Sequence, residues 1–323
     1  MNEVLAGRYR LTGELGRGGM GVVWRARDET LNRDVAVKEL LLPRETSEAH
    51  RELAAQRAVR EARAAARLRH PGIITVHDVV LADGRPWIVM ELLSGRSLDK
   101  LVKQDGPLRP PRAAAFGIGV LEALHAAHKR GVLHRDVKPA NVFLRDDGRT
   151  VLTDFGIASL TGDAPLTRPG ALIGSPAYMA PERIRGEPAG PPSDLWSLGA
   201  TLYALVEGRT PFARSTSAGT LSAVLTESPA LPQRAGPLAG LLLRLLTNDP
   251  AERPTAAQTL DELAELAELS DTSQSVKATG RTGPPPLTRV RIPVRTSTRR
   301  QGRSAGGHPG GPPRSRSPLW PSW

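Results

Sequence analysis

Hydrophobic and polar positions alternate in short runs through the first third of the chain, a pattern typical of half-buried strands. Glycine, proline and aspartate bound several of these runs and favour turns between them. The strand-like segments are 9–15, 22–27, 34–38, 73–80 and 87–92. The pattern therefore predicts an N-terminal region built mainly from strands.

A helical period interrupts this region once, between residues 47 and 69, before His70-Pro71-Gly72 ends it. The predicted inner face of this helix is Ala54, Ala58, Glu61, Ala65 and Leu68.

After Gly95 the apolar period is mainly helical, and the last predicted helix covers 256–268. Within this part, the pattern predicts a helix over 193–207, with Ser193 as its N-cap and Gly208 as its C′ residue.

Gly, Pro, Ser, Thr and Arg dominate from Ser270 onward, and such a composition cannot bury enough apolar surface to offset the entropy of ordering. We therefore predict that 269–323 is a disordered, basic tail. The formal net charge is +11, and the ten basic residues and one acid after residue 270 account for +9 of it. A nucleic-acid role is thus limited to weak, salt-sensitive binding through the tail.

The sequence excludes several classes of protein. It contains no cysteine, which rules out disulfides, thiolate metal sites and thiol catalysis. Its longest apolar stretches, 113–124 and 238–246, are shorter than the ~20 residues of a membrane-spanning helix. Residues 1–7 lack the basic start and apolar run of a signal peptide. We therefore expect a cytoplasmic protein without a membrane span.

A glycine cluster, Gly16-Arg17-Gly18-Gly19-Met20-Gly21, lies between two predicted strands. A glycine-rich turn can fold over phosphate groups and offer them backbone N–H donors. The same spacing marks dinucleotide sites, but there a helix follows, whereas Val22-Val23-Trp24 continues as a strand. A flexible hairpin is the alternative for this motif taken alone.

The segment Val35-Ala36-Val37-Lys38 is a candidate ligand-binding strand. Because side chains alternate on a strand, Ala36 and Lys38 share one face while the two valines point to the core. The small Ala36 leaves room for a flat ligand, and Lys38 can reach its phosphates; an exposed lysine is the alternative. Glu61 needs a partner if it is buried, and Lys38 is the candidate; a solvated Glu61 is the alternative.

The densest group of chemistry-bearing residues is His134-Arg135-Asp136-Val137-Lys138-Pro139-Ala140-Asn141, followed by Thr153-Asp154-Phe155-Gly156. Asp136 can orient a hydroxyl nucleophile and accept its proton. Lys138 can neutralise charge on a transferring phosphoryl group. Asn141 and Asp154 supply hard oxygen ligands suited to Mg²⁺. The joint spacing argues against a set of ordinary polar loop residues.

With these motifs in this order, the chain resembles the protein kinase family, specifically the eukaryotic-like (Hanks-type) serine/threonine kinases of bacteria. The resemblance covers about 9–268. It implies an α+β, bilobal fold, with a β-rich N-lobe of about 9–92 that carries one helix and a mainly α-helical C-lobe of about 95–268. It also implies binding of ATP and Mg²⁺ between the lobes, and transfer of the γ-phosphate to Ser/Thr hydroxyls of proteins, including its own.

The resemblance also assigns roles at the nucleotide site. Asp136 is expected to be the catalytic base and Lys138 the γ-phosphate contact, with Asn141 and Asp154 as the Mg²⁺ ligands. Lys38 is expected to contact the α/β-phosphates and to pair with Glu61. The other expected ATP-binding residues are Leu15, Gly16, Gly18, Gly21, Val23, Ala36, the gating residue Met90, and Glu91 and Leu93 of the hinge.

Structural positions match the family as well. Ala180-Pro181-Glu182 resembles the end of the activation segment, and Glu182 and Arg253 match a buried ion pair of the family. Asp194 matches the residue that braces the catalytic loop. Breaking the ion pair is expected to impair folding as well as catalysis.

Two further positions bear on specificity and regulation. Ser175 matches the residue that bridges Asp136 and Lys138, and with Lys138 it indicates Ser/Thr specificity. Thr167 is the first candidate phosphosite and Thr161 the second; the phosphate would pair with Arg135. Pro169 stands where many bacterial relatives carry a second threonine.

Other classes of protein make different predictions. A pseudokinase would carry a broken position among Lys38, Asp136, Asn141 and Asp154, and all four are intact. A small-molecule phosphotransferase of related fold would not be expected to keep Ser175. A nucleic-acid binder would need more than a tail without a reader motif. The tail segment 295–300 places hydroxyls among arginines, as in an autophosphorylation or self-inhibitory segment, although a passive tail is the simplest interpretation. Partners expected besides ATP are protein substrates and a transient homodimer.

Overall fold

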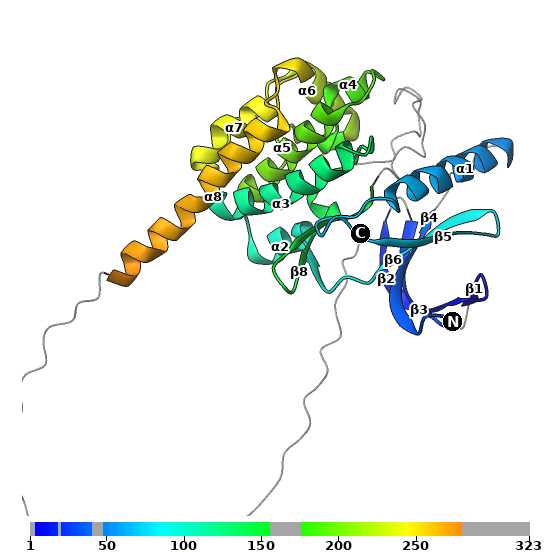
Figure 1. The fold of residues 1–323 in the computed structure, drawn as a ribbon. Helices are drawn as coiled ribbons and strands as arrows, with labels where there is room; N and C mark the ends of the chain where they lie inside the picture. Colours follow the sequence, from blue (N-terminus) through cyan, green and yellow to red (C-terminus); the bar gives the residue numbers. More distant parts are fainter. Residues whose placement is uncertain (1–3, 19–20, 41–47, 156–175, 280–323) are drawn as a thin grey trace, which may run out of the picture.

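The N-lobe is a six-stranded antiparallel sheet in the computed structural model, which describes residues 4–18, 21–40, 48–155 and 176–279. The strand order is β1-β2-β3-β4-β6-β5, so neighbours in sequence are mostly neighbours in space (Figure 1). The strands are β1 (Val4–Leu5), β2 (Tyr9–Gly18), β3 (Gly21–Asp28), β4 (Arg33–Leu40), β5 (Val76–Ala82) and β6 (Arg85–Glu91). The predicted strand-rich region is confirmed, and β1 adds a short edge strand.

The alternation predicted for β4 is confirmed, although both of its faces are buried. Val35 and Val37 belong to a cluster with Tyr9 and Trp87. Ala36 belongs to a different cluster on the opposite face of the sheet. Lys38 is only 5% exposed, so it is not the solvated strand-end lysine of the alternative interpretation.

A single described helix of this lobe, α1 (Glu48–Ala65), lies beside the sheet (Figure 1). Its buried stripe is Ala55, Ala58, Ala62 and Ala65. Ala54, which the sequence placed on the inner face, is only half-buried. Alanines at both 54 and 55 allow two overlapping stripes, and the helical period alone does not choose between them.

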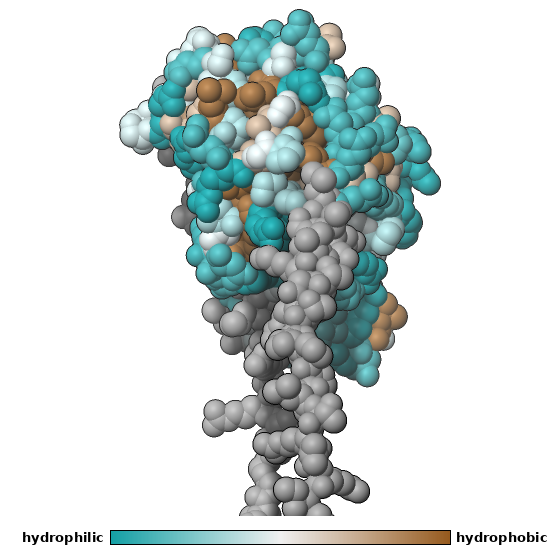
Figure 2. Space-filling model, turned by 90° about the vertical axis from the view of Figure 1, so that its left-hand side faces the viewer, coloured by the Kyte–Doolittle hydropathy of each residue, from teal (hydrophilic) through white to brown (hydrophobic). Residues whose placement is uncertain are grey.

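The C-lobe is mainly helical and contains a small antiparallel sheet of β7 (Gly95–Ser97), β8 (Val142–Arg145) and β9 (Thr150–Leu152) (Figure 1). Its helices are α2 (Leu98–Asp105), α3 (Pro110–His128), α4 (Pro181–Ile184), α5 (Pro191–Glu207), α6 (Ser217–Thr226), α7 (Ala239–Leu245) and α8 (Ala256–Thr279). Helix α5 is buried along almost its whole length and forms the centre of the lobe. On the face shown in Figure 2, hydrophobic side chains reach the surface in small groups among hydrophilic ones.

Helix α5 begins two residues earlier than predicted, with Gly190 as its N-cap. Pro191 and Pro192 occupy the first helical turn, where proline loses no intrahelical hydrogen bond. Ser193 is therefore the third helical residue, and its Oγ accepts a hydrogen bond from the Gly190 N–H at 3.3 Å. The predicted C′ residue is confirmed, since Gly208 has φ +73°, in the left-handed region.

Helix α8 continues to Thr279, beyond the predicted end at 268, and its end projects from the lobe (Figure 1). Residues 270–279 contain neither glycine nor proline, and the first glycine after them is Gly280. The composition of the whole tail hid this local absence of helix breakers. Residues 280–323 lie outside the described part of the chain. Among the described helices, none has the length and hydropathy needed to cross a membrane.

A buried aspartate of the N-lobe makes stability dependent on pH. The Arg8 guanidinium donates two hydrogen bonds of 2.8 Å to Asp28, which is fully buried. These bonds lower the pKa of Asp28 from 3.8 to about 2. Because the folded pKa is depressed, the stabilisation is complete above pH ~4 and is lost as the pH falls toward 2.

We therefore expect Asp28→Asn to lower the guanidinium unfolding midpoint at pH 7, with the difference from wild type shrinking steadily between pH 4 and 2. Asp34→Asn is the control, because Asp34 pairs with Arg25 and Arg27 at a more exposed position. A difference between wild type and Asp28→Asn that stays constant from pH 7 to 2 would contradict this account.

Candidate active site

Three of the predicted catalytic residues are in direct contact on the loop between α3 and β8. Asp136 Oδ2 lies 2.8 Å from Lys138 Nζ and accepts a 2.9 Å hydrogen bond from Asn141 Nδ2. Asn141 Nδ2 also donates to the Asp136 carbonyl oxygen at 2.8 Å. The short helical turn Pro139–Asn141 brings Asn141 back toward Asp136. The arrangement holds one carboxylate between a cation and an amide.

His134 connects this loop to the segment that carries Asp154. It is fully buried, and burial lowers the pKa of its imidazole, so the ring is neutral. Its Nε2 donates to the Thr153 carbonyl oxygen at 2.8 Å, and its Nδ1 accepts from the Asp136 N–H at 3.2 Å. The ring also packs edge-on against Phe155, with 4.6 Å between centroids. His134 thus fixes the two aspartate-bearing segments relative to each other.

Asp194 of α5 binds the backbone of the same loop. Its Oδ1 accepts from the Arg135 N–H at 2.8 Å, and its Oδ2 accepts from the His134 N–H at 2.9 Å and from His128 Nε2 at 2.7 Å. Burial opposes its ionisation, but the hydrogen bond from His128 and the contacts with His134 outweigh this, so the pKa of Asp194 is lowered. These are the contacts expected of a residue that braces the loop.

The backbone of the loop is strained at Arg135, whose φ of +67° is costly for any residue with a Cβ. Asp194 holds the N–H of Arg135, and Arg183 Nη1 of α4 donates to its carbonyl oxygen. Hydrogen bonds at both the N–H and the carbonyl oxygen therefore fix the strained Arg135. The sequence did not indicate Arg183, since arginine is abundant in the chain and no pattern separates this one.

Lys38 and Glu61 each have a partner that the sequence did not predict. Lys38 Nζ lies 2.8 Å from Asp154 Oδ2, and both side chains are buried. Glu61 Oε1 lies 3.7 Å from Arg135 Nη1. Asp154 has φ +64°, a turn of the backbone that places its carboxylate beside Lys38. Both of these ion pairs join the two lobes, and the pair of Lys38 with Glu61 stays a prediction.

An apolar cluster joins the lobes next to this ion pair. Val23, Ala36, Met90 and Leu93 of the N-lobe belong to it, with Leu15 packed against it. Phe143 and Val151 of the C-lobe sheet also belong to this cluster. Phe143 is a site residue that the sequence did not indicate. It is the second residue of β8, and Asn141 belongs to the helical turn before that strand, so no strand alternation connects the two residues.

Glu91 fixes the connection between the lobes. Its N–H donates to the Thr75 carbonyl oxygen at 2.9 Å, and its Oε1 accepts from the Thr75 N–H at 2.8 Å. Its Oε2 accepts from Arg145 Nη1 at 3.3 Å. The hinge is therefore tied to β8 as well as to the sheet, and Leu93 follows it as a buried residue.

The predicted glycine loop joins β2 and β3, where Gly16 pairs with Val23 and Gly18 with Gly21. Gly21 has φ +153°, and a Cβ there would lie 2.0 Å from the Glu39 carbonyl oxygen. Only glycine fits this close approach of two strands. Residues 19–20, which come between these strands in the sequence, lie outside the described part of the chain.

The predicted buried ion pair is present between α4 and the C-terminal part of the lobe. Arg253 Nη1 and Nη2 donate to the two oxygens of Glu182, each at 2.8 Å, and Ser193 Oγ donates to Glu182 Oε1 at 2.7 Å. Burial alone would raise the pKa of Glu182. The hydrogen bonds from Arg253 and Ser193 outweigh burial, so the pKa of Glu182 lies below its ordinary value. The Arg253 guanidinium also lies 5.0 Å from the centre of the Trp196 ring.

Asn141 and Asp154 carry the oxygen donors expected of Mg²⁺ ligands. The amide nitrogen of Asn141 is used by Asp136, which leaves the amide oxygen as its acceptor for a cation. One carboxylate and one amide oxygen suit Mg²⁺, which usually takes its remaining ligands from water and substrate phosphates. No group of three or more His, Cys, Asp or Glu side chains in the described ranges offers another metal site. The candidate phosphosites Thr161 and Thr167, and Ser175, lie outside these ranges.

The fold and the site together define a class of protein, and the comparison with family models agrees. The model of the protein kinase domain matches residues 9–263, and the chain belongs to the protein kinase family. The predicted bilobal α+β fold is confirmed.

The relatives that the chain resembles are bacterial. It is 38% identical over 279 residues to a probable serine/threonine-protein kinase of Corynebacterium efficiens, covering 81% of this chain and 42% of that protein. It is 41% identical over 272 residues to serine/threonine-protein kinase PknK of Mycobacterium tuberculosis, covering 81% and 24%. It is 38% identical over 278 residues to serine/threonine-protein kinase pkn3 of Myxococcus xanthus, covering 80% and 49%. The chain therefore spans less than half the length of these relatives.

Proposed function

We propose that this protein is a serine/threonine protein kinase, which transfers the γ-phosphate of ATP to Ser and Thr hydroxyls of proteins in the presence of Mg²⁺. The observation that carries the proposal is the contact of Asp136 with Lys138 and Asn141 within 2.9 Å, in a chain of the protein kinase family. The intact ion-pairing residues Lys38 and Asp154 beside it argue against a pseudokinase.

Each side chain has a distinct part in the proposed reaction. Asp136 orients the substrate hydroxyl and accepts its proton as the oxygen attacks the γ-phosphorus, while the bond from that phosphorus to the bridging oxygen breaks and ADP leaves. Lys138 neutralises charge on the phosphoryl group in transfer, and Lys38 binds the α/β-phosphates. Asn141 and Asp154 would hold Mg²⁺, which supplies charge neutralisation at the phosphates when bound. Val23, Ala36 and Phe143 of the apolar cluster would pack on the adenine ring.

The residue class of the acceptor tests the proposal. Lys138 stands two residues after the base, as in the Ser/Thr branch of the family. Purified protein incubated with Mg²⁺, γ-labelled ATP and a general protein substrate such as casein is expected to yield phosphoserine and phosphothreonine, and chelation of Mg²⁺ by EDTA is expected to stop the reaction. Label on tyrosine alone, or label that EDTA does not affect, would contradict the proposal.

Regulation by autophosphorylation is part of the proposal. A phosphate on Thr167 would compete with Glu61 for the Arg135 guanidinium, from which Glu61 lies 3.7 Å away. Pairing of Arg135 with this phosphate would order the activation segment, as the family resemblance implies.

Arg183 provides a further test through its hold on the catalytic loop. Arg183→Gln is expected to lower kcat by about tenfold or more, because the strained Arg135 and the adjacent Asp136 lose a fixed position. The KM for ATP and the melting temperature are expected to stay close to wild type, since the nucleotide cluster and the core are untouched. Steady-state kinetics and a thermal melt check both.

Two companion variants distinguish positioning from folding. Arg183→Lys keeps a donor and is expected to restore part of kcat. Arg185→Gln removes a more exposed arginine two residues further along the chain and is expected to change nothing. Equal kcat in the Arg183→Gln variant and wild type would show that Asp194 alone suffices to hold the loop.

A further inference from the structure

Both carboxylate oxygens of Glu91, the last residue of β6, have partners in other segments of the chain. Its Oε1 accepts a 2.8 Å hydrogen bond from the Thr75 N–H, and its Oε2 lies 3.3 Å from Arg145 Nη1 of β8. The Glu91 N–H also donates to the Thr75 carbonyl oxygen at 2.9 Å. The residue at which the N-lobe sheet passes into the hinge is therefore fixed through both its backbone and its side chain.

Both partners of Glu91 belong to segments that are attached to the C-lobe sheet. Arg145 is the last residue of β8, and its Nε lies 3.4 Å from Asp147 Oδ2. The segment that precedes Thr75 is bonded to β9, where the Ile74 N–H donates to the Leu152 carbonyl oxygen at 3.0 Å. Glu91 is thus connected to the C-lobe sheet through two separate strands.

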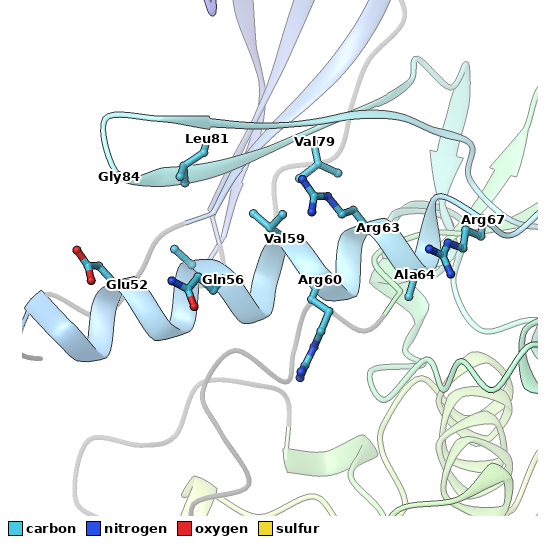
Figure 3. A pocket seen from close by; sticks show the side chains of 11 residues that line it. Glu52, Gln56, Val59, Arg60, Arg63, Ala64, Arg67, Val79, Leu81 and Gly84 are labelled. Carbon is cyan, nitrogen blue, oxygen red and sulfur yellow. The ribbon is translucent and has the colours of Figure 1, made fainter.

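On the N-lobe side, Glu91 belongs to a packed unit that includes α1. Strand β6 pairs with β5, and Figure 3 shows the resulting hairpin lying along α1, with Val59 pointing toward it. Val76 and Ile88 of the hairpin share a buried cluster with alanines of the helix. The contacts of Glu91 therefore join this unit to the C-lobe sheet at the point where the chain crosses between the lobes.

The two ends of the hinge are held differently. At its exit, the Asp146 N–H donates to the Ser94 carbonyl oxygen at 3.2 Å, and Gly95 pairs with Arg145 in the ladder between β7 and β8. These are backbone contacts, which a substitution at Arg145 leaves in place. At its entry, the hinge reaches β8 through the side chains of Glu91 and Arg145, and this contact depends on the identity of both residues.

We propose that Arg145 is a positioning residue for nucleotide binding, which acts through Glu91 to fix the hinge backbone that receives the adenine base. The inference rests on the proposed function, under which the backbone of Glu91 and Leu93 binds the base. A ligand binds more weakly when the protein must first order the groups that contact it. Loss of Arg145 is therefore expected to weaken binding of the base and to leave the transfer step unchanged.

The test compares adenosine with ATP on the full chain. Adenosine carries the base but no charge, so removal of an arginine does not change its affinity through long-range attraction. Isothermal titration calorimetry is expected to show that Arg145→Gln binds adenosine about three- to fivefold more weakly than wild type, the effect of a partly exposed ion pair. The KM for ATP is expected to rise by a similar factor, while kcat at saturating ATP and the melting temperature stay close to wild type.

Three companion experiments isolate the contact with Glu91. Arg145→Lys keeps the cation and is expected to restore part of the adenosine affinity. Arg214→Gln removes an arginine from an ion pair with Glu227 elsewhere in the C-lobe and is expected to change nothing. In a double-mutant cycle, Arg145→Gln is expected to have little further effect in the Glu91→Gln background, because the contact through which Arg145 acts is already lost.

Three results would overturn the inference while leaving the proposed function intact. The first is wild-type affinity for adenosine in Arg145→Gln. The second is an equal loss of affinity from Arg145→Gln in the Glu91→Gln background, which would mean that Arg145 acts through another contact. The third is a changed kcat with unchanged adenosine affinity, which would assign the pair to lobe movement or to transfer. Failure of the wild type to bind adenosine and ATP would contradict the proposed function as well.

Discussion

Replacement of Asp136 by asparagine is expected to lower kcat for phosphoryl transfer by about 10²–10⁴-fold, the range of a lost general base. Asparagine keeps the size of the side chain and can still orient a hydroxyl, but it cannot accept its proton. Lys138 and Asn141 would lose the carboxylate that they share, at 2.8 and 2.9 Å. The KM for ATP is expected to change little, because the nucleotide cluster lies on other elements.

The control for this variant is Asp105→Asn, at an aspartate at the end of α2 whose ion-pair partner is Arg96 on the surface. It is expected to leave kcat and KM unchanged. If Asp136→Asn retained a kcat within a few fold of wild type, Asp136 would not be the base, and the proposed mechanism would be wrong.

Arg253→Ala is expected to cost about 3–5 kcal/mol of the free energy of unfolding, because it leaves Glu182 as a buried carboxylate without its cation. Arg253 and Glu182 are 0% and 4% exposed, and the pair has two parallel hydrogen bonds of 2.8 Å. The packing of the guanidinium on Trp196 is lost as well. Denaturant unfolding monitored by tryptophan fluorescence measures the change.

Arg244→Ala is the matched control, because Arg244 pairs with Glu262 on the surface of the same lobe. Its cost is expected to stay below about 1 kcal/mol. The pKa of Glu182 is lowered in the folded state, so the pair stabilises the fold above the ordinary pKa of 4.5 and less as the pH falls below it. The difference in the free energy of unfolding between Arg253→Ala and wild type should accordingly become smaller in acid. Equal losses of this free energy in Arg253→Ala and Arg244→Ala would contradict the burial of the Arg253–Glu182 pair.

The sequence predicted those parts of the fold whose signal is local. The alternation of Val35, Ala36 and Val37 defines β4 because a strand exposes successive side chains to opposite faces. Gly208 marks the end of α5 because the left-handed conformation favours glycine. The start of α5 was misplaced, because Ser193 has the side chain of an N-cap but serves inside the first turn, where Gly190 and two prolines had already begun the helix. The end of α8 was missed because an average over the tail conceals ten residues without a helix breaker.

The candidate site also contains residues with a local sequence signal and residues without one. Asp136, Lys138 and Asn141 stand within six positions of one another, so a local motif predicted that they belong to one site, and the structure adds the contacts among them. Arg183 reaches the catalytic loop from α4, which lies more than forty residues further along the chain, and one arginine among many carries no local signal. The pairing of Lys38 with Asp154 depends on how two lobes close on each other, and the residue pattern leaves that geometry open.

The central claim is that Asp136 and its neighbours transfer phosphate to Ser and Thr hydroxyls, and its most direct test is phosphosite mapping by mass spectrometry after incubation with Mg²⁺ and ATP. Wild type and Asp136→Asn are compared after equal treatment, with ATP binding and the melting temperature measured for both. We predict phosphate on Thr167 or other Ser and Thr residues of the wild type, and none on the variant. Absence of phosphate from both folded, ATP-binding proteins would contradict autophosphorylation and favour a nucleotide-binding scaffold, and equal phosphate on both would show that Asp136 is not the catalytic base.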